Sequence, residues 1–140
     1  MYKDLLWIFT QLPDDYIVLD TETTGLPDEN GPPDIVTLGI TVVRNRKIAE
    51  SVEFKTRPQK HISEEAQRIH GITNEQAAEF ESFDAQWNQI ADYLKDQLIV
   101  IHNASFDWTI LLDHVARYGL SMPPVQGVFC SQKAAIAWAQ

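Results

Sequence analysis

The sequence has 140 residues, and its 20 acidic and 11 basic side chains give a formal net charge of −9. This charge disfavours a protein that coats a nucleic-acid backbone, because such proteins are usually basic. The single cysteine, Cys130, excludes an internal disulfide framework, and no apolar run approaches the ~18 residues of a membrane span. Without a signal-peptide pattern at its start, the sequence predicts one soluble globular domain, in the cytoplasm and with no membrane contact.

The first half of the chain predicts a helix and three strands. Apolar residues recur at helical spacing over residues 2–12, and Pro13 ends this helix, which either covers the sheet or docks a partner. A polar loop is expected over residues 25–34, and a turn at residues 44–46. The three strands are expected at residues 16–20, 35–43 and 47–56.

The second half alternates helices with short strands. Ser63 is placed to cap a short helix that ends at Gly71, and Thr73 with Gln76 forms the capping-box pattern of another. One face of the next helix carries Phe83, Trp87, Ile90, Ala91 and Leu94. Then follow a strand at residues 98–101, a helix at 104–118 capped by Asn103, a strand at 128–130 and a helix from Ser131. This order predicts an α/β fold with a mixed sheet and helices on both sides.

Two acids, Asp20 and Glu22, follow the first apolar strand. Alternate side chains of a strand share a face, so both carboxylates are expected to point the same way. Two adjacent carboxylates repel each other, and a cation between them relieves that repulsion. An ordinary strand running into a polar loop would show the same pair.

A third acid, Asp107, lies in the first turn of the helix after strand 98–101, where the helix dipole favours its charged form. Ligands of open α/β sheets gather at the carboxyl ends of strands. If these two strands are parallel neighbours, Asp20, Glu22 and Asp107 converge. Three carboxylates suit hard divalent cations such as Mg²⁺ or Mn²⁺.

Three motifs together resemble the DEDD exonucleases of the DnaQ-like, ribonuclease H-like fold. They are Asp20-Thr21-Glu22-Thr23-Thr24-Gly25, Ile69-His70-Gly71-Ile72-Thr73 and His102-Asn103-Ala104-Ser105-Phe106-Asp107. The resemblance runs from about residue 16 to the last residue, and the His-Gly-Ile-Thr motif is closest to the DEDDh subclass. It implies a three-layer α/β fold with a mixed five-stranded sheet flanked by helices. Residues 1–140 would be one exonuclease domain without its last helices.

The resemblance implies a 3′–5′ exonuclease that releases nucleoside monophosphates one at a time from single-stranded 3′ ends. Two Mg²⁺ or Mn²⁺ ions would act on the scissile phosphate. Asp20 would bridge both ions, Glu22 would hold the ion nearer the attacking water, and Asp107 would hold the other. These three residues are therefore the expected metal ligands and catalytic residues.

The resemblance also implies substrate contacts. Residues after the first acid would cradle the terminal nucleotide, two residues further on would contact its sugar, and an aromatic would wedge against the last bases. In that order these are Thr21, Thr23, Thr24 and Leu26, then Glu65 and His70, then Phe106 with Asn103 nearby. Each has a plainer alternative, because a helix-dipole charge, a backbone-bonded histidine or a core aromatic fits the same positions.

Three further histidines are expected to have no catalytic role. His102 is expected to pack internally rather than bind metal, and His61 and His114 are expected at the surface. Cys130 has no histidine or basic neighbour in sequence that would make it a nucleophile.

The chain departs from the family in one respect. The family carries a fourth aspartate preceded by a general base, in an H-x4-D or Y-x3-D pattern, and neither pattern follows Asp107. The missing motif is expected roughly 25–50 residues beyond Gln140. Because general-base catalysis contributes about 10²–10⁴-fold, the 140 residues by themselves are expected to be weakly active or inactive.

The alternative function is a non-catalytic module that binds nucleic-acid ends or docks on a polymerase or nuclease. The three acids favour catalysis, since an idle site need not keep mutually repelling carboxylates. A polymerase or another protein partner is compatible with either reading. No motif fixes the 2′-hydroxyl contacts that separate RNA from DNA, so both remain candidate substrates, with DNA favoured.

Overall fold

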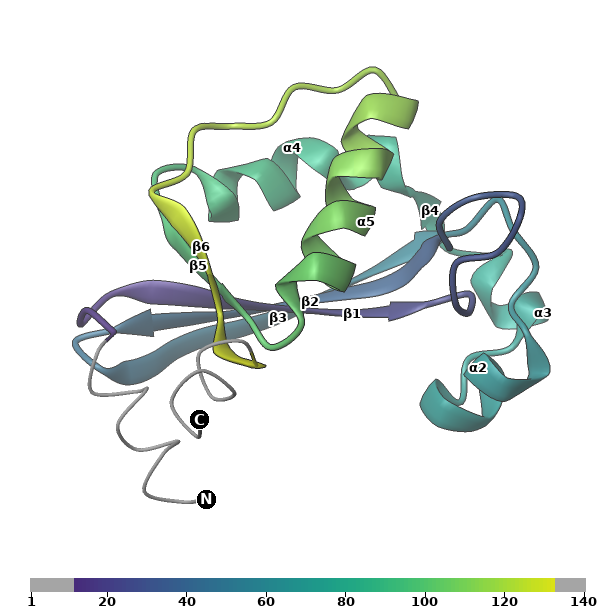
Figure 1. The fold of residues 1–140 in the computed structure, drawn as a ribbon, viewed down its shortest axis with the longest axis horizontal. Coiled ribbons are helices and arrows are strands. Elements are labelled where there is room, and N and C mark those ends of the chain that lie inside the picture. Colours follow the sequence, from purple (N-terminus) through teal and green to yellow (C-terminus); the bar gives the residue numbers. More distant parts are fainter. Residues whose placement is uncertain (1–11, 133–140) are drawn as a thin grey trace.

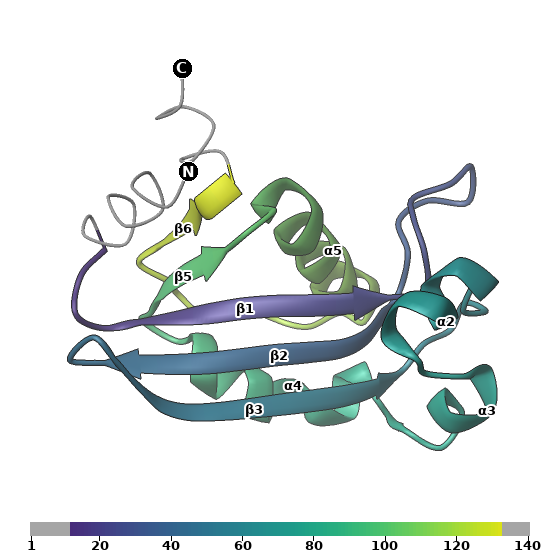
Figure 2. The same cartoon turned by 90° about the horizontal axis from the view of Figure 1, so that it is seen from below.

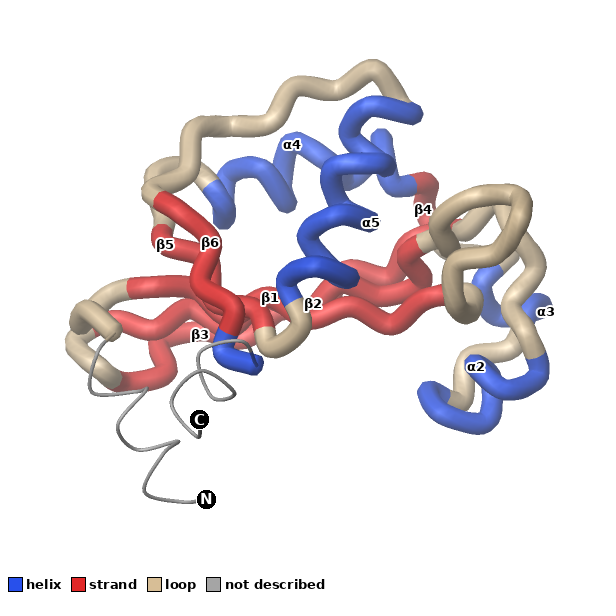
Figure 3. Tube along the Cα trace, in the orientation of Figure 1, coloured by secondary structure: helices blue, strands red, loops and turns tan. Residues whose placement is uncertain are grey.

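A computed structural model describes residues 12–132 of the chain. Figure 1 shows a twisted sheet with helices packed on it, and Figure 3 separates strands from helices by colour. Its strands lie in the order β4-β3-β2-β1-β5-β6. The strands are β1 (Tyr16–Thr23), β2 (Ile35–Arg44), β3 (Lys47–Arg57), β4 (Glu81–Ser82), β5 (Leu98–Ile101) and β6 (Gly127–Cys130). The helices are α2 (Glu64–His70), α3 (Asn74–Ala77), α4 (Phe83–Leu94) and α5 (Ala104–Arg117).

The sheet is mixed, as predicted. β1, β2 and β3 form an antiparallel meander, whereas β5 pairs parallel with both β1 and β6. The β2–β3 turn is tight, because Asn45 and Arg46 adopt φ of 52° and 63°, the left-handed values of a two-residue hairpin. The parallel pairing of β1 with β5 brings the carboxyl ends of two strands to one edge.

The strand number differs from the prediction of five. The sixth strand, β4, has only two residues, and they pair with Thr56 and Arg57 at the end of β3. Two residues are too few for a period-two pattern, so a strand of this length leaves no mark in the sequence. β1 is also longer than predicted, because its polar residues Thr21–Thr23 continue to pair with β2.

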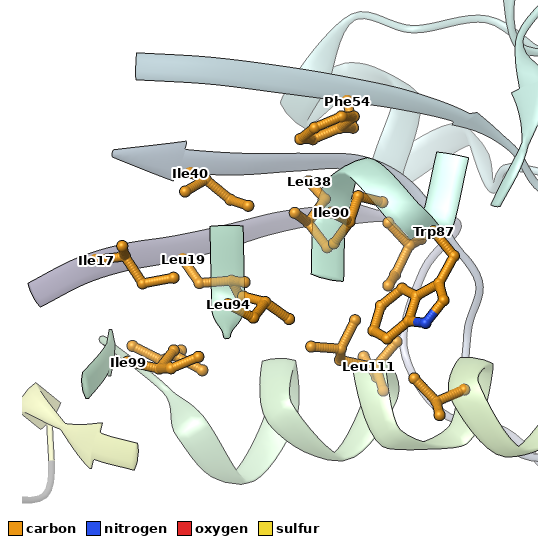
Figure 4. Close-up of a cluster of buried hydrophobic side chains, with 14 of the residues drawn as sticks. Ile17, Leu19, Leu38, Ile40, Phe54, Trp87, Ile90, Leu94, Ile99 and Leu111 are labelled. Carbon is orange, nitrogen blue, oxygen red and sulfur yellow. The ribbon is translucent and has the colours of Figure 1, made fainter. Parts of the chain in front are cut away.

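The main core lies between the sheet and two helices, α4 and α5, which cover the same face (Figures 1 and 2). Alternate residues of the strands point into it, among them Ile17 and Leu19 of β1. Figure 4 shows these side chains meeting Trp87, Ile90 and Leu111 of the helices. The helices predicted for residues 2–12 and from Ser131 onward fall, wholly or mostly, outside the described residues.

The short helices α2 and α3 lie at the far end of the sheet from the β2–β3 turn, over a separate cluster around Val36 and Ile62 (Figure 2). Both predicted caps are confirmed. Ser63 Oγ accepts the amide of Ala66 at 3.1 Å, and Thr73 and Gln76 form the full capping box. No helix within the described residues is long and apolar enough to cross a membrane.

Candidate functional site

Asp20 and Glu22 lie inside β1, where they pair with Gly39 and Thr37 of β2. Asp20 is exposed and Glu22 is half-buried. Both lie past Val18, the last residue of β1 that pairs with β5, so this edge of β1 faces the start of α5. Strand alternation turns both carboxylates away from the helical face and turns Thr21 toward it.

Asp107 stands in the first turn of α5 and is only 8% exposed. One carboxylate oxygen, Oδ1, accepts a hydrogen bond from Thr21 Oγ1 at 3.1 Å. Burial raises the pKa of Asp107 to about 6, and repulsion from Asp20 and Glu22 adds to this, against the Thr21 bond and the charge of His102. The pKa of Asp107 is therefore raised, contrary to the shift expected from the helix dipole, because desolvation outweighs the dipole; the carboxyl is still charged at pH 7.

Asp20 and Glu22 are close enough to Asp107 to repel its charge. The hydrogen-bond partner of Asp107 is Thr21. Within residues 12–132, no group of three His, Cys, Asp or Glu side chains is spaced to hold an ion as it stands. The donor chemistry nevertheless fits a hard divalent cation, since all three donors are carboxylates under mutual repulsion. Side-chain rotation would have to bring them together around such an ion.

A cavity of about 240 Å³ adjoins these acids at the end of β1. We call it the β1–α2 cavity. Its walls come from β1, the residues after it, α2 and α5. The residues are Thr21, Glu22, Thr23, Gly25, Leu26, Ser63, Glu65, Ala66, Ile69, His70 and Phe106. Most of the residues predicted to contact substrate therefore lie around one hollow.

Four lining residues had no predicted contact or metal role: Gly25, Ser63, Ala66 and Ile69. The side chains of Leu26 and Ile69 are 76% and 74% exposed, which is unusual for large apolar residues. The spacing of Glu65, Ala66, Ile69 and His70 places them on one face of a helix. Because Glu65 and His70 were already predicted to contact substrate, this spacing could have predicted that Ala66 and Ile69 line the same cavity.

His70 ties α2 to β1. The backbone amide of Ile72 donates to Nδ1 at 3.1 Å, so Nε2 carries the proton and donates to the carbonyl of Thr23, also at 3.1 Å. Both ring nitrogens are thus occupied by backbone groups, while the ring lines the cavity. Gly71, at φ 76°, closes the helix in the left-handed conformation that glycine adopts without strain.

Thr24 is buried and does not line the β1–α2 cavity. Its amide donates to the Asp34 carbonyl at 2.9 Å, and its hydroxyl accepts the Asp34 amide at 3.0 Å. Its own carbonyl accepts the amide of Ser63, the cap of α2, at 2.9 Å. Thr24 therefore connects β1, the 25–34 loop and α2.

Asp34, the hydrogen-bond partner of Thr24, connects this region to α5 and to the segment before α2. Its side chain is 1% exposed and accepts Arg117 Nη1 at 2.6 Å and the amides of Gln59 and Lys60 at 2.6 and 2.9 Å. Burial by itself would raise the pKa of Asp34, but the Arg117 bond and charge and the two amides together hold it below its ordinary value. The charged carboxylate thus holds α5 to the segment before α2.

Two histidines lie elsewhere than predicted. His114 is buried, where the Ile35 amide donates to Nε2 at 3.1 Å and Nδ1 donates to the Ile110 carbonyl at 2.9 Å. Burial lowers its pKa, so it stays neutral. His102 is exposed, with Nδ1 3.2 Å from Ser131 Oγ, and does not pack internally. Neither position could be read from sequence, because partners 29 or more residues away decide them.

Asn103 and Phe106 begin α5. Asn103 occupies the cap position but makes no side-chain cap bond, because its Oδ1 instead accepts the hydroxyl of Ser105 at 3.0 Å. It does not line the β1–α2 cavity. Phe106 both lines that cavity and packs against the main core, so the two alternatives for it coexist.

A family model and a relative of known name match the sequence. Residues 17–137 match the family model RNase T, described as exonuclease. DNA polymerase III subunit epsilon of Buchnera aphidicola subsp. Schizaphis graminum is 38% identical over 97 residues, which are 65% of this chain. The match spans 41% of that relative's length.

Two solved structures share the fold. Exonuclease X, in complex with 5′ overhanging duplex DNA, superposes with a TM-score of 0.61 at 28% identity, over 81% of this chain and 58% of that one. The nuclease domain of 3′hExo, a DEDDh family member, superposes with a TM-score of 0.65 over 79% of this chain and 62% of that one. At 16% identity, the second likeness shows the fold alone.

Proposed function

The chain belongs to the RNase T exonuclease family of DnaQ-like proteins, and from that premise we propose that it is a 3′–5′ exonuclease acting on single-stranded ends. The proposal has residues 1–140 form one exonuclease domain that releases nucleoside monophosphates. The observation that carries it is the β1–α2 cavity, which gathers six predicted contact residues beside Asp20 and Asp107.

The proposed metal ligands are Asp20, Glu22 and Asp107, for two Mg²⁺ or Mn²⁺ ions. Bound ions of this kind lower the pKa of water and stabilise charge on phosphoryl oxygens. The chain's own part is to supply three carboxylates whose repulsion favours a cation. The hydrogen bond from Thr21 fixes Oδ1 of Asp107. The other carboxylate oxygen, Oδ2, is then the proposed metal-coordinating atom.

The proposed nucleotide contacts divide by chemistry. Leu26, Ile69 and Phe106 offer apolar surface to a base, a contact that tolerates any base. Glu65, with Thr21 and Thr23, offers polar groups to the sugar. His70 acts as a wall, because backbone groups occupy both its nitrogens.

Two predicted contact residues have indirect roles in this proposal. Thr24 supports the cavity from beneath through Asp34 and Ser63. Asn103 holds the start of the helix that carries Phe106 and Asp107. The polymerase III name of the relative supports DNA as the substrate and a polymerase as partner. Because neither general-base pattern follows Asp107, we infer weak hydrolysis by these 140 residues.

Hydrolysis and metal binding test the proposal together. A 5′-labelled single-stranded oligonucleotide incubated with Mn²⁺ should shorten slowly by single nucleotides, and no shortening should occur in EDTA. Calorimetric titration with Mn²⁺ should give heat for the wild type and much less for Asp20→Asn, because removing one carboxylate weakens the site. Internal cleavage would contradict an exonuclease. Equal heats from both proteins, with no cleavage, would favour the non-catalytic end-binding module.

A further inference from the structure

The peptide group between Asp34 and Ile35 is held from both sides. Its carbonyl, which belongs to Asp34, accepts the amide of Thr24 at 2.9 Å. Its N–H, which belongs to Ile35, donates to Nε2 of His114 at 3.1 Å. The first bond reaches the residue directly before Gly25, where the lining of the β1–α2 cavity resumes, and the second reaches α5. One peptide group therefore joins the helix layer to the edge of that cavity.

His114 bonds β2 at an irregular point of the sheet. The register between β1 and β2 shifts between Glu22 and Thr23, just where Thr23 pairs with Ile35. There the Ile35 amide donates to a side chain of α5, and the Ile35 carbonyl accepts Thr56 Oγ1 at 2.9 Å. Both backbone groups of the first residue of β2 are thus bonded to side chains.

Only neutral His114 can accept the Ile35 amide. Nδ1 donates to the Ile110 carbonyl at 2.9 Å, so in the neutral ring Nε2 keeps a lone pair for the bond. A second proton would sit on Nε2, and two N–H groups would then face each other. Because His114 is only 2% exposed, this conflict is relieved only by moving the ring or the peptide group.

The surroundings of His114 disfavour its charged form. The charged groups that face it come from its own helix and from the segment before β2: Arg117, Asp113 and Asp34. Burial is the largest effect and lowers the pKa of His114, and the Arg117 charge acts in the same direction. The Ile110 bond and the two carboxylates oppose this fall without cancelling it. The remaining neighbours are two aromatic rings, with centroids 5.1 and 6.3 Å away: Phe83 and Tyr118.

A shift of this peptide group reaches the β1–α2 cavity through Thr24. The Thr24 hydroxyl accepts the Asp34 amide at 3.0 Å, and the Thr24 carbonyl accepts the amide of Ser63 at 2.9 Å. Ser63 both caps α2 and lines the cavity. Moving the Asp34 backbone therefore moves the start of α2 relative to β1, and with it one wall of the cavity.

We propose that His114 is a positioning residue, whose neutral ring holds the β1–α2 cavity in shape and whose protonation releases it. Its consequence for activity rests on the proposed function, because the shape of the cavity matters only if the cavity receives a 3′ end. The contact itself belongs to the protein without metal or substrate and is testable there. Acid thus acts on the site through a residue that touches neither substrate nor metal.

Amide hydrogen exchange of the metal-free protein tests the contact. Exchange is followed by NMR at pH 7 and pH 5 and corrected for intrinsic rates. A histidine with a lowered pKa binds its proton more readily once released, so falling pH favours the released form. Protection of Ile35 should fall about 3- to 30-fold relative to Leu19 and Ile40, since each pH unit below the ordinary value of 6.5 contributes at most about tenfold.

His114→Gln separates this contact from other groups that titrate in the same range, Asp107 among them. Glutamine offers one acceptor and one donor at every pH. Its Ile35 protection should therefore match that of the wild type at pH 7 and change less than about twofold by pH 5. The affinity for dTMP in Mn²⁺ should likewise fall less steeply with acid than in the wild type. His61→Gln, at an exposed position, is the matched control and should keep the wild-type dependence.

Wild-type spectra keep the proposal testable even if His114→Gln does not fold. Long-range ¹H–¹⁵N correlations should show a protonated Nδ1 and an unprotonated Nε2 at pH 7. A proton on Nε2, or Ile35 protection that follows Leu19 and Ile40 down to pH 5, overturns the positioning role. Parallel dTMP profiles for wild type and His114→Gln overturn it too and leave the proposed function standing. If the wild type binds no dTMP at pH 7, the proposed function fails and the positioning role fails with it.

Discussion

At the scale of single residues, the balance between burial and nearby charges determines the pKa of the acids at this site. Asp107 is a carboxylate that the fold keeps nearly dry and places within range of two like charges. Thr21 offsets part of this cost with one hydrogen bond. A buried carboxylate with a raised pKa is typical of a functional site, here one that binds a cation, rather than of a residue that stabilises the fold.

Asp107→Asn should therefore stabilise the metal-free protein at pH 7. An acid whose folded pKa lies above its unfolded value costs stability once the pH rises through the folded pKa, here about 6. Asparagine keeps an acceptor for Thr21 without the charge. The gain should be on the order of 1–2 kcal/mol in urea unfolding at pH 7 and should vanish below about pH 4. Asp92→Asn, on an exposed part of α4, should change little at either pH, and a loss of stability at pH 7 in Asp107→Asn would contradict this account.

At the scale of elements, the candidate site depends on how α2 is held against β1. The connection runs from α5 through Arg117 to Asp34, from Asp34 to Thr24, and from Thr24 to Ser63 at the start of α2. His70 closes the other end of α2 onto Thr23. Glu65 and Ile69 are thus placed by bonds at both ends of a seven-residue helix.

Asp34→Asn should loosen this connection. Breaking a buried ion pair by removing one partner costs about 3–5 kcal/mol, and we expect about 3 kcal/mol because the Arg117 side chain is 27% exposed. The folded pKa of Asp34 is lowered, so its contribution is present above pH 3.8, the unfolded value, and lost as the pH falls through the folded pKa. Urea unfolding between pH 7 and pH 2 should show a flatter curve for the variant. Arg46→Ala breaks an exposed pair with Asp14 of similar length, 2.7 Å, and should cost less than about 1 kcal/mol; equal losses would contradict the anchoring role.

At the scale of the whole molecule, parallel pairing of β1 with β5 brings the strand carrying Asp20 and the helix carrying Asp107 to one edge of the sheet. The chain is acidic overall, yet its site is proposed to hold a polyanion. With a net charge of −9, attraction to the phosphates must be local rather than spread over the surface.

The salt dependence of binding should therefore be shallow. Each phosphate neutralised on a single strand adds about −0.7 to the slope of log K against log salt. For contacts confined to the 3′ end of the strand, we expect a slope of about −1 to −2 for a dT10 oligonucleotide, measured by fluorescence anisotropy at constant free Mn²⁺. A slope steeper than about −4 would require a basic track that this surface charge argues against.

Local patterns in the sequence were enough to predict most of the elements and their caps. Apolar runs located the five longer strands, and helical spacing located α4. The caps at Ser63 and Thr73 formed as predicted, because their partners lie within three residues. The motifs around Asp20, His70 and Asp107 likewise identified the family. These features depend on short-range geometry, which the order of residues contains.

Burial and long-range partners could not be read in this way. Thr24 became a joint because of Asp34, His114 became a core residue because of Ile35, and β4 exists only beside the end of β3. Burial raises the pKa of Asp107, and the bond that opposes this rise comes from Thr21, 86 residues earlier in the chain. Order along the chain thus determined which residues are candidates for the chemistry. Desolvation and contact across the sheet, which exist only once the chain has folded, determined which candidates line the cavity and which hold it in place.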